Sequence, residues 1–253
     1  MKGASRRRSF GVVAAWVVAV AATALLVVGV TQYDRIMCHV NYPSALDALP
    51  GKPGLEVPLD IAAVDGNSNG VLDALDIVAG ARLEVSGRTV YDGAYFDGGY
   101  PPDGRGVCTD VVWRALAAAG YDLKSLVDAD IRANLSSYPR VGGRPDPNID
   151  FRRVPNLVSF FARHALTLTT DVKAGDVANL INWQPGDIVV FGKPTEHVGV
   201  VSDLRRADGV PLVIHNAGPW ASESDILLTW PTALTHHFRF PWSGLDATSR
   251  FPS

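Results

Sequence analysis

The sequence predicts an α+β fold in which N-terminal helices pack on a small antiparallel sheet, preceded by one transmembrane helix. Helical apolar periodicity dominates residues 76–164, whereas short apolar runs bounded by glycine and proline dominate the last third. Helices that come first and strands that come later, with short connections, are typical of such an antiparallel architecture. The 253 residues suffice for one well-cored domain and an appendage.

Residues 1–30 are predicted to be a short cytoplasmic tip and an uncleaved signal anchor. An uncharged run from Phe10 to Val30 has about the length needed to cross a bilayer, and basic residues precede it: Lys2, Arg6, Arg7 and Arg8. Because such basic residues stay in the cytoplasm, we expect a single-pass protein of the inner (cytoplasmic) membrane whose remaining chain is periplasmic or otherwise extracytoplasmic. The alternative is a cleaved secretory signal peptide, whose apolar region is usually shorter.

Residues 31–58, punctuated by proline and glycine, are expected to be a spacer, and residues 59–76 hold a loop of calcium-binding type. Side-chain oxygens fall at loop positions 1, 3, 5, 9 and 12, and Gly70 at position 6 supplies the sharp turn. The loop resembles dockerin repeats and EF-hands. The predicted ligands of a structural Ca²⁺ are Asp65, Asn67, Asn69, Val71 (through its carbonyl), Asp73 and Asp76. The alternative is a surface turn before a helix.

The next domain, residues 77–253, is organised around a helix that begins at Cys108. Val111, Val112, Ala115 and Leu116 give this helix one apolar face. A helix N-terminus favours an anion, so the Cys108 thiol is expected to ionise more easily than a free thiol, with Asp110 opposing that effect. The alternative is that Cys108 is a small buried hydrophobic residue.

The remaining elements follow from periodicity and turn residues. Helices are predicted over 123–135 and 155–164, separated by a long loop over 136–150. Strands are predicted over 188–191, 197–202, 211–215 and 236–240.

Two of these strands bring histidines together. His197 opens one strand and His215 closes the next, so a hairpin loop centred on Arg206 would place them directly opposite each other, and a half-residue shift would place Asn216 there instead. A nucleophilic cysteine needs a base, and the base needs an orienting partner.

The motifs resemble a known enzyme group. Cys108 at a helix start, Gly186–Phe191, His197–Val201 and Ile214–Asn216 look like the NlpC-type branch of the papain-like cysteine peptidase superfamily, which comprises bacterial cell-wall peptidases and amidases. More narrowly, four motifs resemble an exported bacterial family catalogued as a domain of unknown function: residues 106–112, 148–156, 184–189 and 215–218.

The resemblance implies a papain-like fold and assigns roles to individual residues. Cys108 is then the nucleophile, His197 the base and His215 the orienter. A tyrosine near the oxyanion corresponds to Tyr95, and Asp110 and Asn216 complete the predicted substrate-binding set. No cofactor is expected for catalysis.

The expected function is therefore that of a membrane-anchored cysteine hydrolase that cleaves an amide bond in peptidoglycan stem peptides or a related wall substrate. The alternatives are an acyl or peptidyl transferase with the same Cys-His-His site, and a non-catalytic wall-binding module. A net charge of −3 without a basic stripe gives no reason to expect a nucleic-acid partner. The two cysteines, Cys38 and Cys108, are too few for a disulfide framework.

Overall fold

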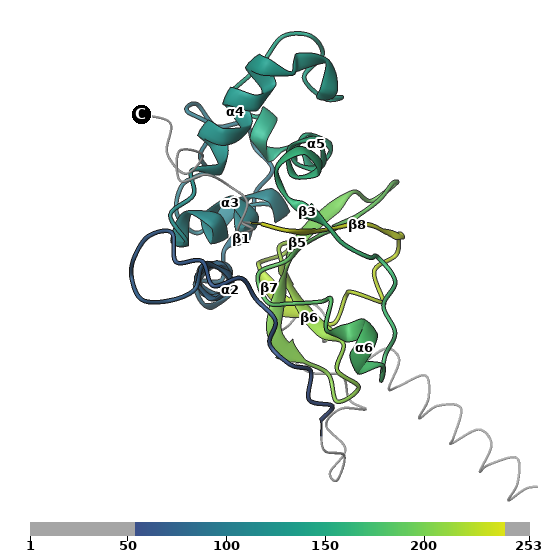
Figure 1. The fold of residues 1–253 in the computed structure, drawn as a ribbon. Helices are drawn as coiled ribbons and strands as arrows, with labels where there is room; N and C mark the ends of the chain where they lie inside the picture. The colour runs from purple at the N-terminus through teal and green to yellow at the C-terminus, as the bar shows by residue number, and fades with distance from the viewer. Residues whose placement is uncertain (1–53, 241–253) are drawn as a thin grey trace, which may run out of the picture.

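The computed structural model describes residues 54–240, which form a mixed α+β fold with a small antiparallel sheet (Figure 1). The helices come mainly from the first half of this range and the strands from the second, as the sequence predicted. The predicted signal anchor and most of the spacer lie outside the described residues. Within residues 54–240, none of the helices has the length and apolar character required to span a bilayer.

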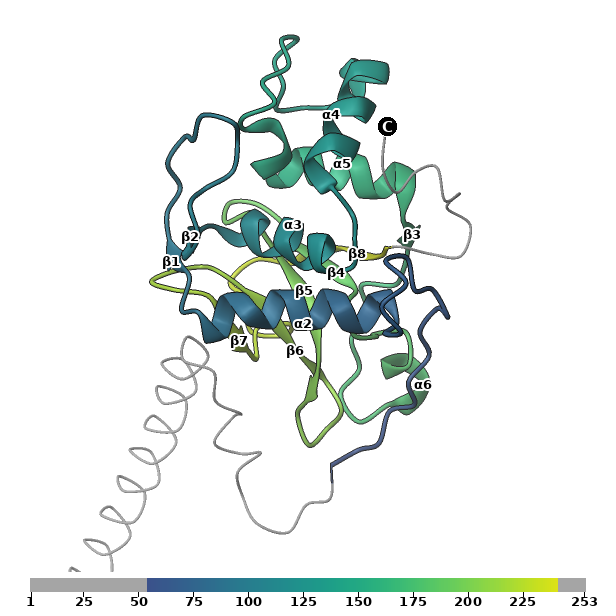
Figure 2. The same ribbon diagram turned by 90° about the vertical axis from the view of Figure 1, so that its left-hand side faces the viewer.

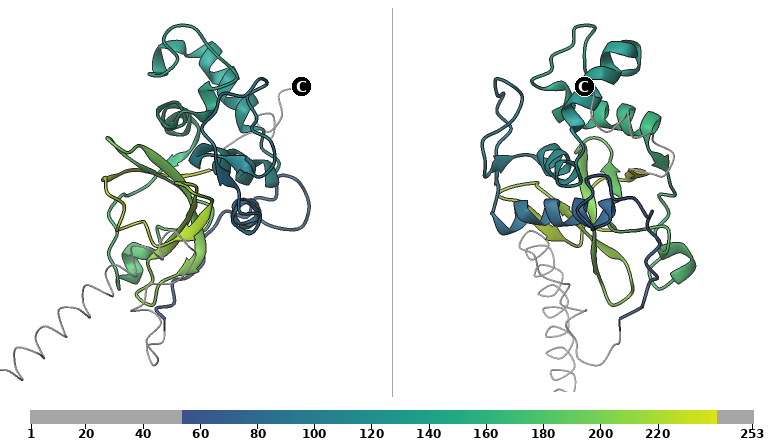
Figure 3. Two further views of the ribbon diagram at one scale, coloured as in Figure 1. Left: turned by 180° about the vertical axis from the view of Figure 1, so that it is seen from behind. Right: turned by 60° about the vertical axis from the view of Figure 1, so that its left-hand side comes forward.

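Two helices lie side by side against one face of the sheet: α2 (Asp73–Ser86) and α3 (Cys108–Ala118) (Figure 2). They approach closely because Gly80 has no side chain, and a Cβ at that position would lie 2.5 Å from the Cβ of Ala118. The rest of this helical layer consists of α4 (Leu123–Ala133) and α5 (Val154–His164), with 3₁₀ turns at Leu135–Ser137 and Asp150–Arg152. Figure 3 shows this layer on one side of the sheet.

The main sheet has six strands in the order β3-β8-β4-β5-β6-β7, and each pair of neighbours is antiparallel. The strands are β3 (Leu166–Thr167), β4 (Ile188–Phe191), β5 (His197–Arg205), β6 (Pro211–His215), β7 (Ser222–Ser224) and β8 (Leu234–Arg239). A separate parallel pair, β1 (Val90–Tyr91) and β2 (Arg105–Gly106), precedes α3. The four predicted strands correspond to β4, β5, β6 and β8, whereas the short edge strands β3 and β7 were not predicted.

Apolar side chains cover both faces of the sheet. Val198, Val200 and Ile214 pack in the cluster that contains α2, α3 and α5. The residues of opposite parity, including Val201 and Val213, pack in a second cluster with Trp183 and with Leu180 of the short helix α6 (Val177–Leu180). Because the central strands are buried on both faces, their sequences are nearly continuous apolar runs rather than alternating ones.

The segment before α2 also packs on the sheet domain. Leu55 and Val57 lie against the second cluster, and the backbone N–H of Leu55 donates to the carbonyl of Ala207 at 2.8 Å. The Gln184 side chain accepts from the backbone N–H of Asp60 and donates to the carbonyl of Pro58, both at 3.0 Å. The end of the predicted spacer is thus held against the domain.

Candidate active site

Cys108 is the first residue of α3, and its thiol lies where the helix meets the start of β5. Its sulfur accepts the backbone N–H of Val198, the residue after His197, and the N–H groups of Thr109 and of Cys108 itself. The N–H groups of Cys108 and Thr109 are among the donors that the first turn of a helix leaves without intrahelical partners. The described cysteine is a free thiol and is only 9% exposed.

Burial decides the protonation state of this thiol. The pKa of Cys108 is raised to about 11: loss of solvent contact is the main cause, the nearby carboxylate of Asp110 also raises it, and the backbone N–H groups oppose the rise. The prediction of an easily ionised thiol is therefore wrong for this state of the protein, because the loss of solvation outweighs the favourable helix N-terminus.

His197 and His215 are joined by a short hydrogen bond. Nε2 of His197 lies 2.9 Å from Nδ1 of His215, with the rings nearly perpendicular at 88°. Nε2 of His215 lies 2.8 Å from the hydroxyl of Ser224 and 3.3 Å from that of Ser222. The structure thus brings the two predicted histidines together and adds serines that the sequence analysis missed.

The register that produces this contact differs from the expected one. Val200 pairs with Ile214 and Val201 with Val213, and a register shift follows between Val201 and Arg205. Continuing this pairing toward the start of β5 places His215 opposite Gly199 rather than opposite His197. The histidines are therefore diagonal neighbours on the same face of the sheet, a separation that long side chains can bridge.

Gly199 makes the diagonal contact feasible. A Cβ at this position would lie 2.5 Å from Cγ1 of Val213 and 3.3 Å from the Cβ of His215. The missing side chain leaves the space in which the imidazole of His197 reaches His215.

The His197 ring is enclosed by aromatic side chains. It stacks on Trp230, with ring centroids 4.2 Å apart at an angle of 14°, and Phe191 lies beside it at 6.3 Å. This burial lowers the pKa of His197 to about 3. The imidazole is therefore neutral at physiological pH. In the described residues no hydrogen bond joins it to the Cys108 sulfur, which bonds to the backbone of the next residue instead.

The comparisons with known proteins place this arrangement in a family. A family model described as Domain of unknown function (DUF1287) matches residues 78–240, well over half of the chain. The chain belongs to this family. It is also 41% identical over 192 residues to the Uncharacterized protein YijF of Escherichia coli (strain K12), which covers 73% of this chain and 87% of that protein. No solved structure matches the chain.

The predicted membership of a domain-of-unknown-function family is thus confirmed. The DUF1287 match contains Cys108, His197 and His215, and it begins after the predicted calcium loop. The relation to NlpC-type enzymes stays a prediction.

Asp110 was predicted to contact the substrate, but the structure places it fully buried in the DUF1287 domain. Its two carboxylate oxygens accept from Nε and Nη2 of Arg152, both at 2.9 Å, and Oδ2 also accepts the backbone N–H of Val107 at 2.7 Å. Arg152 in turn donates to the carbonyl of Ala94 at 2.9 Å. Asp110 therefore caps α3 and fixes the loop before it, which is a structural role.

Asn216 is likewise fully buried rather than open to a substrate. Its Nδ2 donates to the carbonyls of Thr89, at 3.1 Å, and Gly106, at 3.0 Å. The side chain thereby ties the end of β6 to the residues that lead into Cys108.

Of the two tyrosines, Tyr91 rather than Tyr95 lies near enough to Cys108 for the two side chains to interact electrostatically. The Tyr95 hydroxyl bonds to Asp146 at 3.2 Å and to Asn148 at 3.0 Å, so this side chain contacts the long loop. The pKa of Tyr91 is raised chiefly by burial, and also by the nearby Cys108 and Asp110 side chains. Both tyrosines belong to the aromatic stretch before Cys108. The sequence could not distinguish them, because their positions depend on how this loop folds.

Acid sensitivity of stability follows from the environment of His197. In the unfolded chain this histidine titrates near its ordinary pKa of about 6.5, whereas the folded domain keeps it neutral down to about 3. The unfolded state therefore binds more protons between these values, so the stabilisation is complete above about pH 6.5 and is lost as the pH falls through this window. We expect a loss of a few kcal/mol.

Urea unfolding of the full-length protein across this pH range measures the effect. His197→Gln should flatten the dependence of unfolding free energy on pH, whereas His236→Gln, at a more exposed histidine, should change it little. Equal slopes for the wild type and His197→Gln would contradict this account.

The predicted calcium loop folds as a compact turn against α3. The Asp65 carboxylate accepts the N–H groups of Asn69 and Gly70 at 3.1 and 2.9 Å, and the Asp76 carboxylate faces the side-chain amides of Asn67 and Asn69 at 3.0 Å. Asp73 is engaged elsewhere, by the N–H of Gly66 and the hydroxyl of Tyr121. The backbone N–H of Val71, the predicted carbonyl ligand at position 7, donates an Asx-type hydrogen bond to Asn69 Oδ1 at 2.8 Å.

No group of three or more His, Cys, Asp or Glu side chains in residues 54–240 is arranged to hold a metal ion. That finding does not cover loop carbonyls and asparagine oxygens, so calcium binding stays a prediction. Millimolar Ca²⁺ is expected to raise the melting temperature, because related extracellular loops bind at about 10⁻⁴–10⁻³ M. At ten times Kd the gain is about 1.4 kcal/mol, or roughly 3–5 °C.

A thermal-shift titration and calorimetry measure this response. Asp65→Ala should remove it, whereas Asp171→Ala, which removes an exposed carboxylate outside the loop, should retain it. If the wild type shows neither heat of calcium binding nor a thermal shift, residues 65–76 form a surface turn and not a calcium site.

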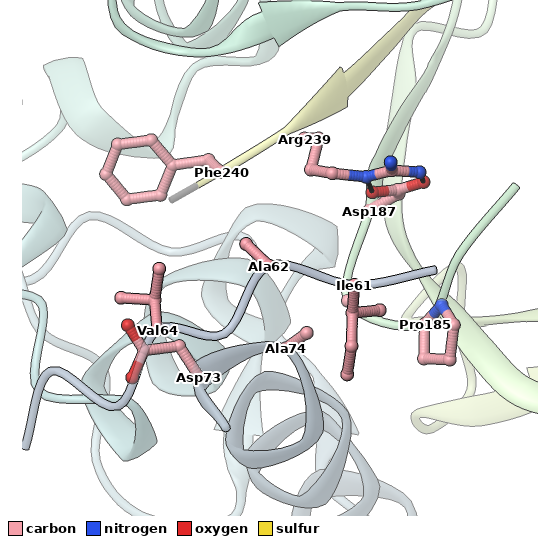
Figure 4. Close-up of a pocket in the computed structure, with 10 residues that line it drawn as sticks. Ile61, Ala62, Val64, Asp73, Ala74, Pro185, Asp187, Arg239 and Phe240 are labelled. Carbon is pink, nitrogen blue, oxygen red and sulfur yellow. Dashed lines mark hydrogen bonds and ion pairs between the residues drawn. The ribbon is translucent and has the colours of Figure 1, made fainter. Parts of the chain in front are cut away.

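Two cavities lie away from the histidines. The one in Figure 4 encloses only about 10 Å³ beside the Asp187–Arg239 ion pair, which is room for about one water molecule. The other, of about 350 Å³, is walled by Tyr100 and Trp113 on the outer side of the helical layer. Neither is lined by Cys108 or by the linked histidines.

Proposed function

We propose that this DUF1287 protein is an exported, membrane-anchored cysteine hydrolase that cleaves an amide bond in peptidoglycan stem peptides or a related wall substrate. The observation that carries the proposal is the placement of the Cys108 thiol at the N-terminus of α3, against the backbone of Val198, the residue that follows His197 in β5, while His197 itself is hydrogen-bonded to His215. The motif resemblance to NlpC-type papain-like enzymes supplies the substrate class, and the mixed α+β architecture agrees with it.

The chemistry starts from a neutral pair, because burial keeps both the thiol and the imidazole uncharged. As the Cys108 sulfur attacks the substrate carbonyl, its proton passes to His197. The negative charge that develops on the carbonyl oxygen is stabilised by the backbone N–H of Cys108.

Collapse of the tetrahedral intermediate breaks the carbon–nitrogen bond, and the imidazolium of His197 gives its proton to the departing amine. The acyl group remains on Cys108 as a thioester. Water then attacks this thioester while His197 takes its proton, and the products are a carboxylic acid and the free thiol. His215 orients the imidazole of His197 through both halves of the reaction.

The location of the protein is part of the proposal. It rests on the basic residues 2–8 and on the uncharged run from Phe10 to Val30, which together favour an anchor in the inner membrane with the catalytic domain outside the cytoplasm.

Mass spectrometry of a peptidoglycan digest tests the activity. Purified full-length protein is incubated with isolated peptidoglycan in H₂¹⁸O, alongside a heat-inactivated sample. A hydrolase should release a new amine and a carboxylic acid that carries one ¹⁸O, and the fragment masses identify the bond.

Two other outcomes would overturn the hydrolase assignment. A new amide without ¹⁸O, formed when an amine acceptor is added, would indicate a transferase that uses the same site. Unchanged peptidoglycan that retains the protein on sedimentation would indicate a wall-binding module.

A further inference from the structure

We propose that Ser224 is a positioning residue that fixes the tautomer of His215 and thereby leaves Nδ1 of His197 unprotonated, as the base of the proposed mechanism requires. The proposal rests on the proposed function, because it concerns how the same site is held ready. It adds Ser224, hydrogen-bonded to His215, to the predicted site of Cys108, His197 and His215.

The sheet places two serine hydroxyls at the far side of the orienter. In the β6–β7 pairing His215 lies opposite Ser222 and Val213 lies opposite Ser224, so both serines project to the histidine face. The Ser224 hydroxyl lies 2.8 Å from Nε2 of His215, and the two hydroxyls are 3.1 Å apart. His215 and Ser224 are both 0% exposed, so water does not compete for these bonds.

The tautomers follow from counting donors. A neutral imidazole has one N–H and one acceptor nitrogen. Nε2 of His197 faces His215, so Nδ1 is the nitrogen left to accept the thiol proton of Cys108, and the proton of neutral His197 must sit on Nε2. Nε2 then donates to Nδ1 of His215, which must be unprotonated, and the proton of His215 must sit on Nε2.

Ser224 is the acceptor that this arrangement needs. When its hydroxyl hydrogen is donated to Ser222, its oxygen is free to accept from Nε2 of His215. In the opposite arrangement Ser224 would donate to Nε2 of His215. The His215 proton would then sit on its Nδ1, and the His197 proton would sit on Nδ1 of His197. A His197 in that tautomer cannot act as the base.

The strand that carries the serines is itself clamped from the other face. Glu223, between the two serines, accepts from Nη2 and Nε of Arg82 on α2, at 2.7 and 3.0 Å. Ser202 of β5 also bonds to Glu223. This anchor holds β7 in register, so the positions of the serine hydroxyls do not depend on His215 alone.

Nitrogen NMR of the full-length protein with ¹⁵N-labelled histidine tests the tautomer directly. In the wild type His215 should carry its proton on Nε2. Ser224→Ala should mix the two tautomers, and Ser224→Thr, which retains the hydroxyl, should restore the wild-type spectrum. Ser159→Ala is the matched control, since it removes a hydroxyl from α5 in the helical layer.

The second readout is the rate at which iodoacetamide alkylates Cys108 as a function of pH, followed on the peptide that carries this residue. Ser224→Ala should lower the rate at neutral pH about tenfold, because one hydrogen bond contributes on that order. Ser224→Thr and Ser159→Ala should react at the wild-type rate.

Failure of this proposal is distinguishable from failure of the proposed function. A wild-type His215 protonated on Nδ1, or a folded Ser224→Ala variant with unchanged spectrum and rate, would overturn the role of Ser224. A wild-type protein that releases no amine from peptidoglycan would instead overturn the proposed function. If Ser224→Ala does not fold, the wild-type spectrum still decides the tautomer.

Discussion

Cys108→Ala is expected to abolish amide hydrolysis while leaving the fold intact. The substitution removes the atom that forms the acyl-enzyme, and loss of a nucleophile in such sites typically lowers kcat by about 10³-fold or more. The sulfur occupies a small volume at the start of α3, and the cap formed by Asp110 does not involve it. We therefore expect a melting temperature within a few degrees of the wild type, measured together with the peptidoglycan digest.

The second cysteine of the chain provides the matched control. Cys38→Ala removes the same sulfur atom at a position outside the DUF1287 match and should retain full activity. A folded Cys108→Ala protein that still released stem-peptide amines would show that the mechanism proposed here is wrong.

Arg152→Met is expected to have the largest effect on stability. The Arg152 side chain is 1% exposed and Asp110 is 0% exposed, so the substitution leaves a buried carboxylate without its cation. Removal of one partner from a buried ion pair typically costs about 3–5 kcal/mol. The variant also loses the bond to the Ala94 carbonyl, which fixes the loop before Cys108.

Urea unfolding of Arg152→Met beside Arg105→Met measures this difference. Arg105 pairs with Asp92 at 3.0 Å, but its side chain is 62% exposed, so that variant should lose less than about 1 kcal/mol. Similar losses in the two variants would contradict the structural role assigned to Arg152.

The elements of the fold were predictable because their patterns are local. The apolar runs at β4, β5 and β6 and the helical spacing after Cys108 are visible within a few residues of sequence. The register between β5 and β6 was not, because it depends on the irregular pairing between Val201 and Arg205. The expected alignment was two residues away from the observed one, and because this shift is even, both histidines stay on one face.

The site was predictable only where chemistry-bearing residues stand out by type. Cys108, His197 and His215 stand out in this way. Asp110 and Asn216 were included in the predicted substrate-binding set, but both side chains are buried and bonded to other parts of the domain.

The partners of these buried residues come from distant segments. Arg152 lies 42 positions from Asp110, and Ser224 comes from a three-residue strand with no apolar pattern of its own. Trp230, which stacks on His197, lies between β7 and β8. Single-sequence periodicity carries no information about such long-range pairs.

Gly199 has a consequence for anyone who transfers this site to another protein. Copying the three reactive residues onto a different antiparallel sheet would not reproduce the histidine pair, because the two rings meet across a position that must stay empty. A transplanted site therefore needs a glycine at the position of Gly199 as well as the two histidines. It also needs a strand alignment that places this glycine opposite His215. The histidine pair thus depends on the absence of a Cβ atom at residue 199.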